Sequence, residues 1–211
     1  MVNTFNDQEL EQLASLAYKT RPTAAKGTVL VGALSTDEAK VFTKPGSNEI
    51  VVAFAGTRPT RAGDLWTDGQ LARGKLSETA RFRRSQKLLS DIRKQFPRAH
   101  ITLTGHSLGG SIAESLADQR SSATAFNPGR RVNKPLQRLK SKLQGRLRAD
   151  DESRYNTTAY VSRFDVVSAG RFLDKGSKRT TYYTNSRYNP LAAHRNNYYN
   201  GGYSRYRRYK K

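Results

Sequence analysis

The feature that most constrains the fold of this chain is a serine flanked by glycines at a junction of strand and helix. Ser107 lies in the sequence GHSLGG (105–110), after the apolar run 101–104 and before a helical pattern. At such a turn the strand and the helix nearly touch, so a Cβ at Gly105 or Gly109 would push them apart. This setting predicts that Ser107 presents its hydroxyl at the edge of a sheet as a nucleophile.

The segments around this turn alternate between strand and helix patterns. Apolar positions three and four residues apart predict helices that begin after Asn6 or Asp7, at residue 78 and at residue 108. Short apolar and β-branched runs predict strands at 28–34, 39–43, 49–54, 100–104, 122–126, 157–164 and 180–184. Because helices separate the strands 49–54, 100–104 and 122–126, we predict an α/β fold with a mostly parallel sheet flanked by helices. The strand-turn-helix setting of Ser107 makes the predicted fold α/β-hydrolase-like.

The chain of 211 residues is long enough for one sizeable domain, which we place at residues 1–195, followed by a tail at 196–211. Within the domain, residues 130–155 are predicted to form an inserted basic amphipathic helix. Its leucines recur at 136, 139, 143 and 147, with Arg and Lys between them. This helix either packs on the core with a solvated basic face or docks on a membrane surface or a partner.

The formal net charge of +21 is unevenly distributed. Residues 1–129 contain 17 Lys and Arg against 12 Asp and Glu, whereas residues 130–211 contain 21 against 5. Such an excess of positive charge favours polyanionic partners, either nucleic acid or an anionic membrane surface. The alternative interpretation is that the charge serves solubility alone. In the tail, tyrosines alternate with arginines, which suits stacking on bases and pairing with phosphates or, equally, a tail without a ligand.

Composition also bears on the compartment. The chain has no cysteine, which excludes a disulfide framework, a thiolate metal site and a cysteine nucleophile. No apolar run approaches the length of a membrane span, and the first residues, MVNTFNDQEL, lack the basic and apolar regions of a signal peptide. We therefore expect a protein that is intracellular or packaged in a virus particle.

A catalytic serine needs a base, and the chain has only three histidines. His106 adjoins Ser107 on the turn, so its side chain is expected to be directed away from the position of the base. His100 lies seven residues upstream of the serine, about 23 Å back along an extended strand. His194 remains as the predicted base, in agreement with the order of nucleophile, acid and histidine along α/β-hydrolase chains.

The third member of a catalytic triad is a carboxylate that holds the histidine. Asp165 directly follows a predicted strand, at the carboxyl edge where such sheets place catalytic loops. We predict Asp165 as the acid, with Asp174 as the alternative; a strand-end cap is the other role open to Asp165. Backbone N–H groups at the start of a helix favour a developing oxyanion, which predicts the N–H of Leu108 as one donor.

These residues resemble the class 3 lipases, α/β-hydrolases that include the fungal triglyceride lipases and related phospholipases. The matching elements span about residues 28 to 195 in the family's order: IVVAFAGT (50–57), DLWTD (64–68), ITLTGHSLGG (101–110), FNP (126–128), FDVV (164–167) and His194. The resemblance implies that Thr57 supplies the second oxyanion donor through its backbone N–H. It also implies that residues 58–70 correspond to the family's lid, with Trp66 either a wall of the acyl groove or a core residue.

The chain also departs from that family. Ala55 stands where the family often has arginine, and the counterpart of the lid is short and polar. We expect a phospholipid or a small ester as substrate, since a cationic surface concentrates an enzyme on anionic membranes.

We therefore predict a serine carboxylic-ester hydrolase with Ser107, Asp165 and His194 as its triad and no need for a metal or cofactor. The alternative is a basic, non-enzymatic protein on a hydrolase scaffold. Such a protein would bind nucleic acid or serve a structural role in an assembly, for example a virion.

Overall fold

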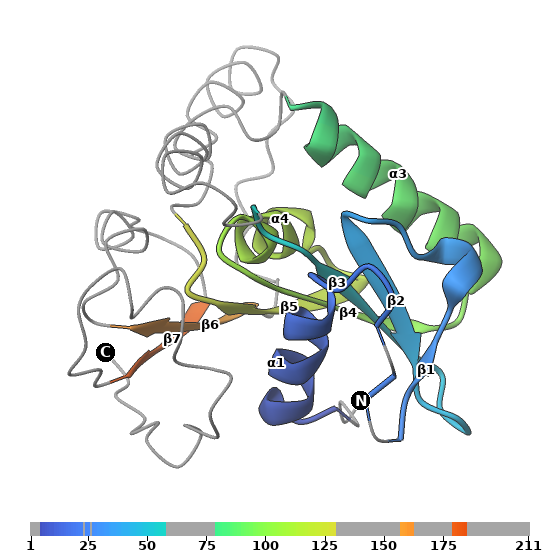
Figure 1. The fold of residues 1–211 in the computed structure, drawn as a ribbon, viewed down its shortest axis with the longest axis horizontal. Coiled ribbons are helices and arrows are strands. Elements are labelled where there is room, and N and C mark those ends of the chain that lie inside the picture. Colours follow the sequence, from blue (N-terminus) through green and yellow to red (C-terminus); the bar gives the residue numbers. More distant parts are fainter. Residues whose placement is uncertain are drawn as a thin grey trace.

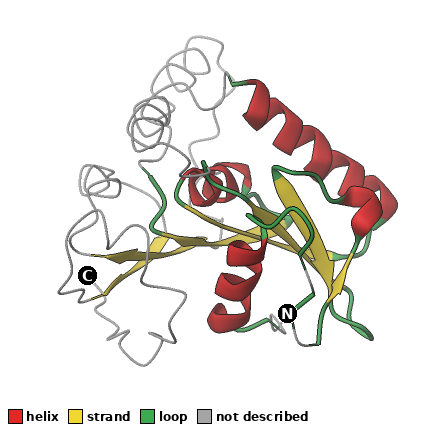
Figure 2. Ribbon diagram, in the orientation of Figure 1, coloured by secondary structure: helices red, strands yellow, loops and turns green. Residues whose placement is uncertain are grey.

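The alternating pattern of the sequence folds as one sheet with helices on both faces in the computed structural model of the chain (Figures 1 and 2). The structure describes residues 5–22, 24–25, 27–57, 79–129, 157–162 and 179–184. Its strands are β1 (Val29–Leu30), β2 (Ala39–Thr43), β3 (Glu49–Phe54), β4 (His100–His106), β5 (Ser121–Phe126), β6 (Thr157–Ser162) and β7 (Arg179–Thr184). Its helices are α1 (Asp7–Leu16), the 3₁₀-helix η1 (Gly32–Leu34), α3 (Ala80–Gln95) and α4 (Leu108–Leu116).

The strands lie side by side in chain order, from β1 to β7. The first three pair antiparallel, and β3 to β7 pair parallel, which confirms the predicted mostly parallel sheet flanked by helices. Phe54 on β3 pairs with Gly105 on β4, and His106 pairs with Phe126 on β5. The residues that follow β3, β4 and β5 therefore meet at one edge of the sheet.

Alternate side chains of β3 face opposite sides of the sheet, and each side has its own apolar core. Ile50, Val52 and Phe54 pack in the cluster that contains α3 and α4 side chains. Val51 and Ala53 pack in the cluster that contains α1 side chains, and Figure 1 shows α1 apart from the other two helices. Each large side chain buried in this way stabilises the fold by roughly 1.5–3 kcal/mol.

Helix α1 begins at a cap formed by local hydrogen bonds. The side chain of Asn6 accepts the N–H of Glu9 at 2.9 Å, and the Glu9 carboxylate accepts the N–H of Asn6 at 2.8 Å, which together make a capping box. Leu10 and Leu13, apolar residues three positions apart on this helix, are fully buried. The structure confirms the predicted helix and selects Asn6 over Asp7 as its cap.

Two boundaries differ from the sequence expectation. The run 28–34 contains only the short strand β1, because the N–H of Leu34 then donates to the Val31 carbonyl at 3.2 Å and closes the turn of η1. Helix α3 begins at Ala80 rather than at residue 78, because the Thr79 side chain accepts the N–H of Phe82 and caps the helix. The other predicted strands and α4 lie within two residues of their observed bounds.

Other predicted features fall outside the described residues. They are the counterpart of the lid at 58–70 with Trp66, the basic insertion at 130–155 and the tail at 196–211. Among the described residues, no helix combines the length and the apolar character that crossing a bilayer requires.

Candidate active site

Ser107 occupies the turn between β4 and α4, at the carboxyl edge of the parallel strands. Its φ of 52° and ψ of −122° lie in a region that L-residues rarely adopt, at a cost on the order of 1–3 kcal/mol. Its N–H donates to the Phe126 carbonyl at 3.1 Å, and its own carbonyl accepts the N–H of Ser111 at 3.0 Å. The neighbouring strand and the first turn of α4 thus hold the predicted nucleophile in a strained backbone.

The glycines beside Ser107 are required by contacts between backbones. A Cβ on Gly105 would lie 2.5 Å from the carbonyl carbon of Gly109, and a Cβ on Gly109 would lie 2.1 Å from the carbonyl oxygen of Phe54. At such distances the backbone would have to move. The steric reason predicted for these glycines is therefore present, and the contacts extend beyond β4 and α4 to the end of β3.

The two predicted oxyanion donors lie at this same edge of the sheet. Leu108 is the first residue of α4, where backbone N–H groups have no partner within the helix. Thr57 follows β3, the neighbour of β4, and the residue before it packs against the turn: a Cβ on Gly56 would lie 2.9 Å from the carbonyl oxygen of His106. Thr57 and Leu108 thus follow the carboxyl ends of neighbouring strands, and their role as donors stays a prediction.

The two histidines that the sequence argument set aside are both described. Nε2 of His106 lies 3.4 Å from Oγ of Ser15 on α1, and the His106 ring lies 5.3 Å from the Phe126 ring, centroid to centroid. The imidazole is thus directed toward α1, on one face of the sheet. His100 opens β4 and lies at the opposite end of that strand from Ser107.

The predicted acid and base, Asp165 and His194, lie outside the described residues, as does the alternative acid Asp174. Along the chain, Asp165 follows three positions after the end of β6, which is parallel to β5. The complete triad therefore stays a prediction.

Two side chains that the sequence did not single out contact this edge. Tyr18, just after α1, donates to the His106 carbonyl at 3.4 Å, and its hydroxyl lies 2.3 Å from the place that a Cβ on Gly56 would take. Arg81, in the first turn of α3, donates to the Ala55 carbonyl. In the sequence Arg81 belongs simply to a basic helix, and no local pattern indicates a contact with a residue 26 positions earlier.

Residues 46–132 match the family described as lipase (class 3). The matched segment contains β3, α3, β4, α4 and β5, and with them every described part of the candidate site from Phe54 to Pro128.

Three solved lipases share the fold. The Lip2 lipase of Yarrowia lipolytica matches with 15% sequence identity and a TM-score of 0.54, over 84% of this chain and 77% of its own. The triacylglycerol lipase of Penicillium expansum matches with 16% identity and a TM-score of 0.55, over 83% and 77%. The lipase of Rhizopus microsporus var. chinensis matches with 17% identity and a TM-score of 0.50, over 84% and 71%.

No curated protein matches the chain significantly. The structural matches show the α/β-hydrolase fold of the lipases, and the family match covers the turn that carries Ser107. Residues 46–132 are thus similar in sequence to the class 3 lipases, and the chain shares the fold of the solved lipases.

Proposed function

We propose that the chain hydrolyses acyl esters with Ser107 as the nucleophile, His194 as the base and Asp165 as the residue that orients the histidine. The observation that carries the proposal is the strained backbone of Ser107 between β4 and the start of α4. Strain that the surroundings of a residue maintain is typical of functional positions. The position of β6 supports the choice of Asp165, because its carboxyl end lies at the same sheet edge as that of β4.

In the proposed reaction, Oγ of Ser107 attacks the ester carbonyl carbon while the imidazole of His194 accepts the hydroxyl proton. The N–H groups of Thr57 and Leu108 donate to the oxyanion as it develops, and Asp165 stabilises the imidazolium. The bond to the alcohol oxygen then breaks, and His194 gives its proton to the leaving alcohol. Water, deprotonated by His194, attacks the acyl-enzyme and releases the carboxylic acid and the free serine.

A fluorophosphonate, which reacts with activated serines, tests the nucleophile directly. We expect one adduct, mapped by mass spectrometry to Ser107, and no adduct in the variant Ser107→Ala. The variant Ser115→Ala, two turns along the same helix, is the matched control and should react like the wild-type protein. An adduct on another residue, or no adduct, would overturn the proposal.

The acid and the base are tested by substitution. We expect His194→Ala and Asp165→Asn each to lower kcat by about 10³-fold or more. His194→Ala lacks the base, and in Asp165→Asn the base is no longer held in the correct orientation. Asp174→Asn is the comparison for the acid. If Asp174→Asn lowers kcat and Asp165→Asn leaves it unchanged, the acid is Asp174.

For the substrate we propose a phospholipid or a small ester. The reason is the net charge of +21, which would concentrate the enzyme on anionic lipid surfaces. Hydrolysis rates over a series of ester chain lengths, and then on anionic and neutral phospholipid vesicles, test this choice, with Ser107→Ala as the blank. Equal rates on the two kinds of vesicle would remove the argument from charge.

A second candidate function is binding of nucleic acid through the C-terminal part. It is favoured by the charge of residues 130–211, where 21 Lys and Arg stand against 5 Asp and Glu. Binding by counterion release falls steeply as salt rises. Measuring DNA affinity against salt, with and without residues 195–211, tests this function, and an unchanged salt slope after truncation would exclude the tail from it.

A further inference from the structure

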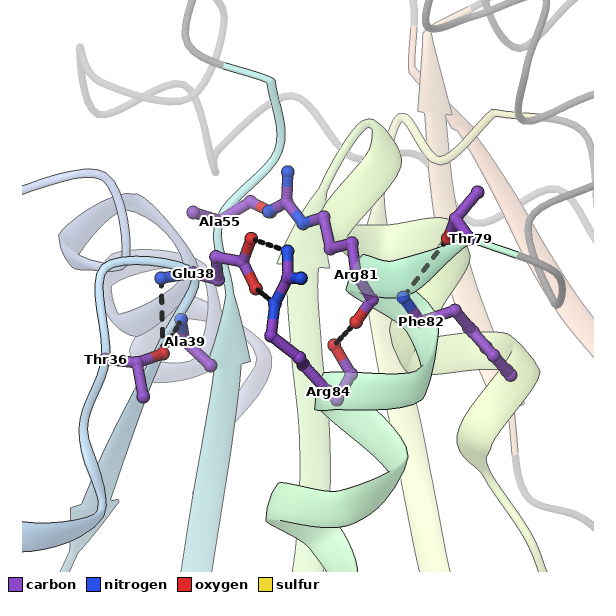
Figure 3. A network of polar contacts seen from close by, with 9 residues as sticks. Thr36, Glu38, Ala39, Ala55, Thr79, Arg81, Phe82 and Arg84 are labelled. Carbon is purple, nitrogen blue, oxygen red and sulfur yellow. Dashed lines mark hydrogen bonds and ion pairs between the residues drawn. The ribbon is translucent and has the colours of Figure 1, made fainter.

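The peptide groups on both sides of Ala55 are held from outside their own strand. The N–H of Ala55 donates to the backbone carbonyl of Glu38 at 2.9 Å. Its carbonyl accepts a hydrogen bond from the guanidinium of Arg81, as Figure 3 shows. Ala55 follows the last residue of β3, so these two bonds hold the chain at the point where it leaves the sheet toward Thr57.

Further polar contacts surround Arg81 in the first turn of α3. Its own backbone carbonyl accepts the hydroxyl of Ser85 at 3.0 Å. Arg84 binds the Glu38 carboxylate with two hydrogen bonds, of 2.6 and 2.9 Å (Figure 3). The hydrogen bond from Arg84 is the largest cause of a lowered pKa of Glu38; burial opposes it, and the nearby charges of Arg81 and Arg84 add to it. An ionised Glu38 thus lies close to the Arg81 guanidinium.

Only one residue, Gly56, lies between the Ala55 carbonyl, which Arg81 contacts, and the N–H of Thr57, the predicted oxyanion donor. The Ala55 carbonyl belongs to the peptide group before Gly56, and the Thr57 N–H belongs to the peptide group after it. Only the φ and ψ of Gly56 separate the two, and glycine restricts these angles less than any other residue. Glycine is required at 56 because the Tyr18 hydroxyl and the His106 carbonyl oxygen leave no room for a Cβ. The direction of the Thr57 N–H must therefore be fixed by contacts on either side of Gly56.

We infer that Arg81 is a positioning residue for the oxyanion site: by holding the Ala55 carbonyl, it sets the direction of the Thr57 N–H. The inference rests on the proposed function, in which that N–H stabilises the oxyanion. Loss of one oxyanion donor lowers kcat by about 10²–10³-fold. Because Arg81 acts through the backbone and leaves the donor in place, its removal should cost less, about tenfold in kcat. KM should change by less than about twofold, since the donor acts on charge that develops in the transition state.

The test compares Arg81→Met, which keeps the length of the side chain and removes its donors, with Arg81→Lys, which keeps a cationic donor. Arg83→Met is the matched control, because Arg83 is exposed on the same helix. With a soluble ester, we expect Arg81→Met to lower kcat about tenfold at unchanged KM, Arg81→Lys to recover part of the loss, and Arg83→Met to behave like the wild-type protein. A wild-type kcat in Arg81→Met, or an effect on KM alone, would overturn the inference.

Amide hydrogen exchange at Gly56 and Thr57 provides a readout that does not depend on activity. We expect it to accelerate in Arg81→Met and not in Arg83→Met, because the held carbonyl is released. If wild-type protein fails to react with the fluorophosphonate, the proposed function fails, whatever the exchange shows. If the wild-type protein reacts at Ser107 and both kcat and exchange are unchanged in Arg81→Met, only the positioning role fails. If Arg81→Met does not fold, Arg81→Lys is measured in its place. If Arg81→Lys is less stable to heat but keeps the wild-type kcat and the wild-type exchange rate, Arg81 has a structural role alone.

Discussion

Gly109 on α4 and Phe54 on β3 are in contact through their backbones, so closely that a Cβ on Gly109 would lie 2.1 Å from the Phe54 carbonyl oxygen. Phe54 also pairs with Gly105, the other glycine of the turn. The strand that leads to Thr57 and the turn that carries Ser107 are therefore packed as one unit. A change in either segment is expected to move the other.

Gly109→Ala is expected to destabilise the fold by about 3 kcal/mol or more, because the new methyl group overlaps a backbone oxygen that no side-chain rotation can move. The free energy of unfolding from urea titration measures this. Gly32→Ala is the control, since a Cβ at Gly32 would meet nothing within 4 Å. It should stay within about 0.5 kcal/mol of the wild-type protein. Similar stabilities for the two variants would show that the contact is not close.

Ser107→Gly is expected to be more stable than Ser107→Ala by about 1 kcal/mol, because glycine adopts a φ of 52° without the strain that a Cβ causes. Both variants lack the hydroxyl, so the difference reports the backbone alone. At the exposed helical position Ser90 the order should reverse, with Ser90→Gly less stable than Ser90→Ala by about 1 kcal/mol. The same order at both positions would mean that the backbone of Ser107 is not strained.

Asp118→Asn is expected to lower stability at neutral pH and to matter less in acid. Burial raises the pKa of the Asp118 carboxyl, but hydrogen bonds from Ser121, Arg93 and the Arg120 N–H, with the charge of Arg93, outweigh it and leave the pKa lowered. Because the folded-state pKa lies below the unfolded value, the stabilisation is fully present above the unfolded pKa, near 4, and is lost as pH falls through the folded pKa.

Unfolding of the wild-type protein and of Asp118→Asn between pH 2 and pH 7 measures this dependence, with Asp37→Asn, at an exposed position, as the control. The gap in unfolding free energy between Asp118→Asn and the wild-type protein should close toward low pH. A gap that is constant with pH would assign the loss to packing rather than to charge.

Asn6→Ala is expected to destabilise the protein by about 1 kcal/mol, because the N–H of Glu9 loses its side-chain acceptor at the start of α1. Thermal or urea unfolding measures the loss. Gln8→Ala, at an exposed position in the same turn, is the comparison and should change stability by less than about 0.5 kcal/mol. An equal effect in the two variants would show that the capping box contributes nothing.

Features that depend on neighbours in the chain could be predicted from the sequence. The Asn6 cap involves residues three positions apart, and the alternation of β3 side chains between the two apolar cores follows from the two-residue period of a strand. The requirement for glycine at 105 is also local, since a Cβ there would meet Gly109 four residues later, whereas the requirement at Gly109 comes from Phe54 on β3. The helices, the parallel strands and the strand-turn-helix setting of Ser107 were for this reason confirmed close to their predicted bounds.

The tertiary structure alone decided the contacts between distant segments. Periodicity does not encode that the strands lie in chain order, that Tyr18 reaches the carbonyl of His106 across 88 positions, or that Arg81 turns from a basic helix to the Ala55 carbonyl. These contacts depend on how whole elements pack, and the free energy of packing comes from both apolar faces of the sheet together. By itself the sequence determined which residues form the turn at Ser107, whereas the packing of α3 and α1 against the sheet decided which side chains hold the chain beside it.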